Sequence, residues 1–162
     1  MLRFNSDHKF KIMQIADTQE IPAVSPDTLS LINNALDREK PDLVIFTGDQ
    51  IKGYSKKFKK DPAIIESTID ILVEPIAKRN IPFMVTYGNH DAQCGIDNRG
   101  QYKFYAKYDN FISGDLRNAD DVGTADIQIY SSTEDKPVFE LYIIDSHGKA
   151  KDGAGYAPVD KE

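Results

Sequence analysis

The sequence predicts an α/β protein that begins with a mainly parallel sheet and continues into an antiparallel hairpin. Three short apolar segments of strand length occur in the first half of the chain, and segments of helical periodicity separate them. Strands and helices that alternate in this way form right-handed βαβ crossovers, which place the strands parallel to one another. Two later segments alternate between apolar and polar residues, as strands with one buried face do.

The first strand is expected over residues 9–16, an apolar run that ends abruptly at the polar loop beginning with Asp17. We expect this strand to be buried. The first helix is expected over residues 26–39, because Ser25 can cap it and Pro26 suits its first position.

The second strand is expected over residues 43–46, a continuous apolar run that is typical of a strand buried on both faces. A second helix is expected at roughly 62–80, where apolar residues recur at helical spacing. Pro75 should bend or locally break that helix, since proline removes a backbone donor. Residues 81–87 form a third apolar run, for which we expect another buried strand.

The second half of the chain has a different pattern. Residues 99–112 suggest a helix, and residues 126–131 and 137–144 are expected to be antiparallel strands joined by a polar turn at 132–136. The tail from residue 148 to residue 162 has no periodicity. No internal repeat is evident, so one domain covering residues 1–162 is the default expectation.

Composition excludes several functional classes. A chain of 162 residues with 40% hydrophobic and 28% charged residues fits one soluble globular domain. Its net charge of −6 argues against a nucleic-acid surface. No apolar run could span a membrane, and no secretory signal is recognisable at the start of the sequence, so a cytoplasmic location is favoured.

The single cysteine and the one basic run are the two local features of the sequence that could suggest a function. The single cysteine, Cys94, excludes an internal disulfide and a multi-cysteine zinc site. The only basic run comprises Lys56, Lys57, Lys59 and Lys60. A solvated loop or helix edge is the favoured interpretation of this run, and contact with an anionic substrate is the alternative.

Each of the three expected parallel strands is followed by a side chain with a hard oxygen donor. These residues are Asp17, Asp49 and Asn89. Any one of them alone could be an ordinary turn residue. The carboxyl ends of parallel strands, however, lie at the same crevice, so the three residues are expected to be close together. Carboxylate and amide oxygens suit divalent cations such as Mn, Mg, Fe or Zn. The sequence therefore predicts a metal site at this edge, with Asp49 on the central loop placed to bridge two ions.

At this point a family resemblance becomes specific. The series Asp17-x-Gln19, Gly48-Asp49 and Gly88-Asn89-His90-Asp91 resembles the calcineurin-like metallophosphoesterase superfamily, which includes purple acid phosphatase-like proteins. The signature of that superfamily is D-x-H, G-D-x-x and G-N-H-D/E, followed by later histidine motifs. The resemblance covers about the first 95 residues strongly and the remainder loosely.

The resemblance implies a fold and a reaction. The fold would be an α/β/β/α sandwich with mixed sheets. The reaction would be hydrolysis of phosphate mono- or diesters in a phosphorylated small molecule or other phosphoester substrate. The cofactors would be two divalent metal ions, with a hydroxide that bridges them acting as the nucleophile.

The resemblance also implies roles for individual residues. Asp17 and Asp49 would bind the first metal ion, with Asp49 shared, and Asn89 would help to bind the second. His90 would stabilise the transition state or protonate the leaving oxygen. Asp91 would fix the tautomer of His90 as its charged partner.

The sequence departs from the family pattern in two places. Gln19 replaces the histidine of the first motif, and an amide is a poorer ligand for zinc or iron, which favours Mg or Mn. The later histidine motifs are not found, because the only other histidines are His8 and His147. His147 follows the last expected strand, and a loop histidine is the favoured interpretation over a substitute ligand.

These departures lead to three expectations and two alternatives. We expect the domain to be incomplete at its C-terminal end, the fragment to be inactive by itself, and its open second sheet to favour a homodimer. One alternative is a metal-dependent hydrolase that acts on other bonds. The other is a non-catalytic metal-binding or interaction module derived from this fold.

Overall fold

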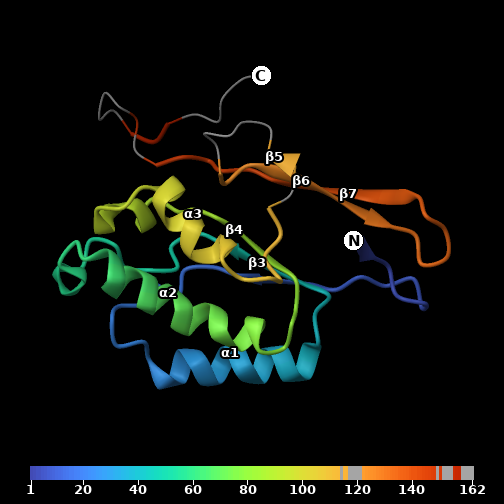
Figure 1. Ribbon diagram of the computed structural model, residues 1–162, viewed down its shortest axis with the longest axis horizontal. Coiled ribbons are helices and arrows are strands. Elements are labelled where there is room, and N and C mark those ends of the chain that lie inside the picture. Colours follow the sequence, from blue (N-terminus) through green and yellow to red (C-terminus); the bar gives the residue numbers. More distant parts are fainter. Residues whose placement is uncertain (114, 117–121, 149, 151–154, 158–162) are drawn as a thin grey trace.

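The computed structural model confirms an α/β protein with two sheets and helices (Figure 1). It describes residues 1–113, 115–116, 122–148, 150 and 155–157. Helices α1 and α2 lie on one side of a three-stranded sheet, and a four-stranded sheet lies on the other side. No helix within the described ranges combines the length and the apolar character that a membrane crossing would need.

The three-stranded sheet is parallel, as predicted. Its strands, in spatial order, are β2 (Ile12–Ile15), β3 (Leu43–Thr47) and β4 (Phe83–Thr86). Ile45 in β3 lies opposite Gln14 on one side and Met84 on the other. The central strand therefore places its loop between the other two.

The first strand differs from the prediction. It covers only Ile12–Ile15 of the expected residues 9–16, and its side chains alternate between exposed and half-buried instead of being buried. Among the described residues β2 pairs only with β3, so its other edge is uncovered and Ile12 stays 38% exposed. The apolar composition of the run did not reveal this edge position, because strand order is a long-range property.

Both predicted long helices are present. Helix α1 (Pro26–Glu39) has the expected bounds, and its first turn is capped by Ser25, whose side chain accepts a hydrogen bond from Asp27 N. Helix α2 (Pro62–Ala77) ends three residues before the expected end, and the Asp61 carboxylate caps it. Pro75 lies inside α2 without ending it at once, and two helical residues follow it.

Helix α3 (Asn98–Ala106) is shorter than the predicted 99–112. After it the chain turns, and Phe111 forms a parallel bridge with Phe83 at the edge of β4. The two phenyl rings pack at 5.4 Å between centroids. Pairing and ring packing against the sheet therefore override the helical periodicity of this segment.

The second sheet contains the predicted hairpin, formed by β6 (Ala125–Tyr130) and β7 (Pro137–Ile143). Two strands that were not predicted pair with β6: β1 (Leu2–Arg3) is parallel to it and β5 (Asp115–Leu116) is antiparallel. A two-residue strand carries no periodicity, so only its pairing defines it.

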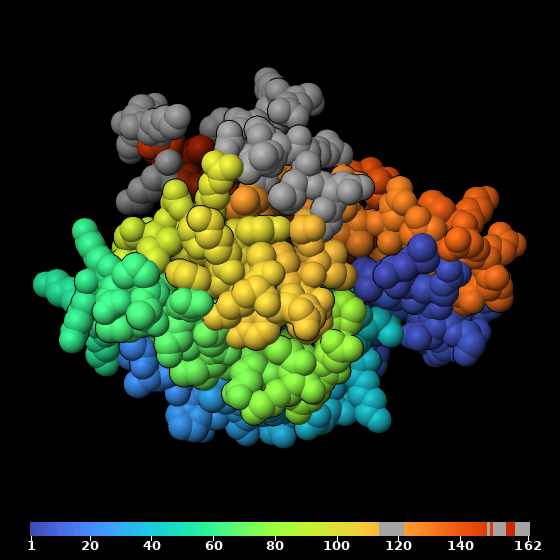
Figure 2. All heavy atoms as spheres, in the orientation of Figure 1, coloured from blue at the N-terminus to red at the C-terminus, as the bar shows by residue number. Residues whose placement is uncertain are grey.

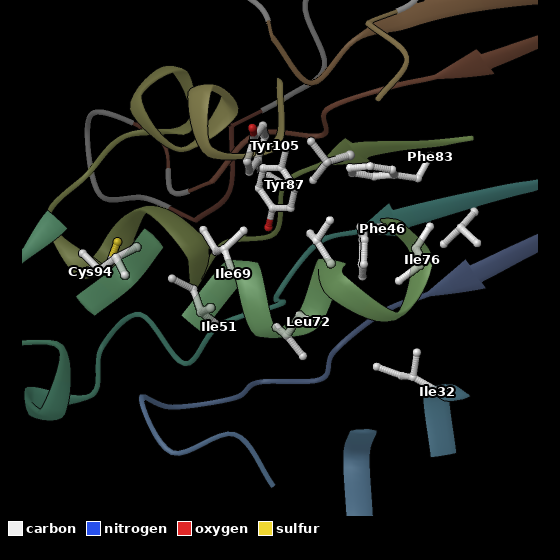
Figure 3. Close-up of a cluster of buried hydrophobic side chains, with 14 of the residues drawn as sticks. Ile32, Phe46, Ile51, Ile69, Leu72, Ile76, Phe83, Tyr87, Cys94 and Tyr105 are labelled. Carbon is white, nitrogen blue, oxygen red and sulfur yellow. The ribbon is translucent and has the colours of Figure 1, made fainter. Parts of the chain in front are cut away.

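Strand β3 divides the core into two parts. Val44 and Phe46 face α1 and α2, where they join the cluster shown in Figure 3. Leu43 and Ile45 point to the opposite face and pack against the second sheet. All of these side chains are buried, and each buried apolar side chain contributes about 1.5–3 kcal/mol relative to an exposed one. The two faces of β3 thus hold the layers together directly beneath the candidate site.

The outer side of β7 exposes apolar side chains. Val138, Tyr142 and Ile144 are each more than half exposed, at 54%, 51% and 55%. In the part of the chain that the structure describes, the helices cover the first sheet and leave this face open. The homodimer expected from such a surface stays a prediction.

Candidate functional site

The loops that follow β2 and β3 are joined by backbone hydrogen bonds. Asp17 N donates to Gly48 O at 3.0 Å, and Gln19 N donates to Asp49 O at 2.9 Å. Asp17, Gln19 and Asp49 have left-handed backbone angles, with φ of 54°, 45° and 53°. The first two predicted loops therefore meet at one end of the parallel sheet through main-chain contacts.

Asp49 connects the central loop to the third loop. Its carboxylate is buried, and Oδ1 accepts a hydrogen bond from His90 N at 2.9 Å. Gly88 makes this approach feasible, because a Cβ atom at that position would overlap the Asp49 carboxylate. Within the described residues Asp49 Oδ2 accepts no hydrogen bond, which leaves one oxygen available for a cation.

Asp91 is buried beneath these loops and accepts hydrogen bonds from four backbone N–H groups. Asp49 N and Gly88 N donate to Oδ2 at 2.7 and 2.8 Å, and Gln50 N and Ile51 N donate to Oδ1 at 3.0 and 3.3 Å. The side chain retains only 2% exposure. Asp91 thus binds the second and third loops to each other.

Burial sets the protonation of this carboxyl group. It raises the pKa of Asp91 to about 6, and the negative charge of Asp49 acts in the same direction. The backbone N–H groups of Gly88, Ile51 and Asp49 oppose the increase, since they stabilise the carboxylate.

The imidazole of His90 has different neighbours from those that the resemblance implied. His90 Nδ1 lies 3.1 Å from Gln93 Oε1, and the His90 ring packs against the Tyr54 ring at 4.8 Å between centroids. The hydrogen bonds of the Asp91 carboxylate instead go to the main chain, because four N–H groups there require an acceptor. The structure therefore gives Gln93, not Asp91, the contact with the imidazole.

The remaining predicted ligands lie around this centre. Asp17 is exposed, whereas Gln19 and Asn89 are half-buried. Gln19 Oε1 accepts a long hydrogen bond of 3.5 Å from the Tyr54 hydroxyl. Among the described residues the Asn89 amide has no hydrogen-bond partner, so it is free to bind a ligand.

The available donors suit a hard divalent cation. Asp17 and Asp49 supply carboxylates, and Gln19 and Asn89 supply amide oxygens, which is a set that Mg or Mn prefers. In the described ranges no group of three or more His, Cys, Asp or Glu side chains comes together as a metal site. His147 lies in the loop after β7, where its N–H donates to Asp145 Oδ1 at 2.7 Å.

Several residues that shape the site were not predicted from the sequence. Gln50 is buried, and its side chain donates to Gly48 O at 2.7 Å and to Ile15 O at 3.2 Å. Glu20 is also buried, and it accepts a hydrogen bond from Ser25 N at 3.0 Å at the start of α1. The signal available in the sequence was their position, because each directly follows a motif residue. Their burial could not be read from the sequence.

The fold and the loop geometry define the class of protein. The chain has two stacked sheets with helices, and the loops after its parallel strands carry Asp17, Asp49 and Asn89, which is consistent with a metallophosphoesterase-type fold. The family model described as calcineurin-like phosphoesterase matches residues 10–158. The chain therefore belongs to the calcineurin-like phosphoesterase family, and the match extends well beyond the first 95 residues.

The names of individual relatives include a phosphatase and two probable inactive purple acid phosphatases. The chain is 28% identical to "Probable inactive purple acid phosphatase 14" of Arabidopsis thaliana, over 96% of this chain and 44% of that protein. It is 32% identical to "Phosphatase DCR2" of Saccharomyces cerevisiae, over 98% and 30%. It is 27% identical to "Probable inactive purple acid phosphatase 29" of Arabidopsis thaliana, over 90% and 42%. The chain thus spans less than half the length of these relatives.

Proposed function

We propose that this chain provides the first part of the active site of a metal-dependent phosphoesterase that hydrolyses phosphate mono- or diesters. The observation that carries the proposal is the hydrogen bond of 2.9 Å between Asp49 Oδ1 and His90 N. This bond brings the Asp49 carboxylate next to the main chain of His90, whose side chain is the proton donor that we propose. Membership of the calcineurin-like phosphoesterase family supports the reaction class.

The residues divide into ligands and a proton donor. Asp17, Asp49 and Asn89 would hold divalent cations, which in such sites neutralise phosphate charge and activate water. His90 would protonate the leaving oxygen. Its Nδ1 faces Gln93, so Nε2 is the nitrogen available to the substrate. The cation we favour is Mg or Mn, because an amide replaces the motif histidine at Gln19.

A non-catalytic metal-binding or interaction module is the second candidate. Gln19 favours this candidate. Its side-chain oxygen accepts a hydrogen bond from the Tyr54 hydroxyl, so that oxygen is already engaged. Two of the relatives also carry the word "inactive" in their names. Under this proposal the loops retain their geometry but cannot support turnover.

The test is hydrolysis by the full-length protein. We would measure release of p-nitrophenol from p-nitrophenyl phosphate and from its bis ester, with Mn, Mg, Zn or Fe added. Metal-dependent turnover is expected, with a loss of at least about 100-fold, or about 2.7 kcal/mol, in Asp49→Asn. Asp109→Asn, which changes an exposed aspartate, is the matched control.

The two candidates give different outcomes. Turnover that persists in Asp49→Asn would contradict the proposed site. If no metal supports turnover but Mn binds to the wild type and not to Asp49→Asn, the non-catalytic module is the better description. Binding can be followed by calorimetry, independently of any substrate.

A further inference from the structure

A cluster of lysines stands out against the acidic chain. The net charge is −6, yet five lysines occur within residues 52–60. The ion pairs of the described residues involve other basic side chains, and no acidic side chain in those ranges pairs with any member of this cluster. Asp61, the nearest acid in sequence, instead caps helix α2. Within the described residues, the positive charge of the cluster is therefore not neutralised by an ion pair.

The loop that carries these lysines is anchored to the fold. Phe58 is buried in the main core with 1% exposure, and Ser55 caps the short helix Lys56–Phe58. Gly53 lies so close to the third loop that a Cβ atom there would overlap the carbonyl oxygen of His90. In Figure 2 the loop belongs to the green-teal projection at the left of the surface. The backbone that carries these lysines is thus held in place by the rest of the fold.

Two adjacent lysines have an unusual backbone. Lys59 and Lys60 are both left-handed, with φ of 53° and 55°. Residues other than glycine rarely adopt this conformation, so an anchored loop is needed to hold two in succession. The stem of Lys60 packs against Gly95, where a Cβ atom would lie 3.2 Å from Lys60 Cγ.

The loop and the short helix η2 (Asp91–Cys94) enclose a pocket of about 270 Å³. Three of the lysines line it, namely Lys56, Lys59 and Lys60, whereas Lys57 does not. Binding sites for whole ligands measure roughly 300–1,000 Å³, so this pocket suits one charged group of a larger ligand. Lysine ammonium groups commonly bind phosphate as point charges.

The pocket lies next to the candidate active site and shares two side chains with its surroundings. Tyr54 and Gln93 line it, and both also contact His90, through the ring packing at 4.8 Å and the contact of 3.1 Å with Nδ1. Tyr54 and Gln93 therefore lie between a ligand group held by the lysines and the imidazole of His90. An ester bound at His90 could reach the pocket with a second group.

We propose that this pocket is an anion subsite that holds a second negatively charged group of the substrate, a phosphate or a carboxylate. The assignment of the scissile group to His90 rests on the proposed function, but anion binding by the pocket does not. The preferred substrates are then phosphoesters that carry a further anionic group, rather than esters of uncharged alcohols.

The first test uses inorganic pyrophosphate in metal-free buffer at low salt. Titration followed by amide NMR should shift the signals of Gly53, Gln93 and Gly95. Lys59→Gln and Lys60→Gln should each weaken binding about 5-fold or more, while Lys57→Gln, the matched control, should weaken it less than about 2-fold. Equal weakening in all three variants, or an absence of shifts at the pocket, would overturn the subsite.

The second test asks whether the subsite serves the substrate. We would compare KM for phenyl phosphate and 4-carboxyphenyl phosphate with the full-length protein. The carboxylated ester should have the lower KM, and Lys59→Gln should remove that advantage, whereas the control Lys57→Gln should retain it. Equal KM values in the wild type would contradict a substrate role. If the protein binds pyrophosphate but hydrolyses no ester, the proposed function is refuted, whereas the anion site is still supported.

Discussion

The substitution Asp91→Asn tests how the loops of the candidate site are held together. The replacement has the same shape but presents an amide nitrogen in place of one carboxylate oxygen, and that nitrogen cannot accept hydrogen bonds. Two of the four backbone N–H groups that donate to Asp91 would then lose their acceptor in a buried site. Each lost acceptor costs about 1–3 kcal/mol, so a loss of about 3 kcal/mol is expected while the wild-type carboxyl group is neutral.

The loss should depend on pH, and its sign follows from the pKa of Asp91. Burial raises that pKa from 3.8 to about 6 in the folded state. A raised pKa means that the folded protein binds the proton more tightly than the unfolded chain, so wild-type stability falls as pH rises from about 4 to about 6. Between pH 4.5 and pH 7.5 the titration of Asp91 should lower the unfolding free energy of the wild type by about 2 kcal/mol. Asparagine does not titrate, so the expected loss shrinks to about 1 kcal/mol at pH 7.5.

Urea unfolding of the metal-free chain at the two pH values measures both quantities. Asp109→Asn serves as control, and it should change the unfolding free energy by less than about 0.5 kcal/mol at either pH. If Asp91→Asn loses more stability at pH 7.5 than at pH 4.5, burial does not raise the pKa of Asp91 in the folded protein. A loss below about 0.5 kcal/mol at both values would refute its role in joining the loops.

Two further predictions concern the core and the single cysteine. Ile69→Ala removes a fully buried side chain of α2 and should destabilise the protein by about 3–4 kcal/mol, measured by urea unfolding, whereas a loss under about 1 kcal/mol would contradict its central position. Cys94 is 1% exposed and burial raises the pKa of its thiol, so it should react with Ellman's reagent far more slowly in the native protein than in urea. Equal rates would show that the segment around η2 opens readily.

Local signals in the sequence were sufficient where a structure depends on neighbouring residues. The bounds of α1 followed from Ser25, Pro26 and the apolar periodicity, because caps and helix faces are set within a few residues. The hairpin of β6 and β7 followed from alternation and a polar turn. The order of strands and motif residues also indicated that three loops would meet, since parallel strands share one carboxyl edge.

Local signals failed where a structure depends on distant residues. Strand β1 exists only because Leu2 and Arg3 pair with Ile129 and Tyr130, far along the chain. The exposure of β2 depends on which strands flank it. Both follow from contacts that no short window of sequence contains.

The site shows the same division. The sequence by itself determined which residues stand at the strand ends, including Asp17, Asp49 and His90, because motif spacing is a property of the chain. Only the tertiary structure decided that Asp91 supports the loops and that Gln93 contacts the imidazole. Hydrogen bonds satisfy the donors and acceptors that packing brings together, and packing involves every layer of the fold.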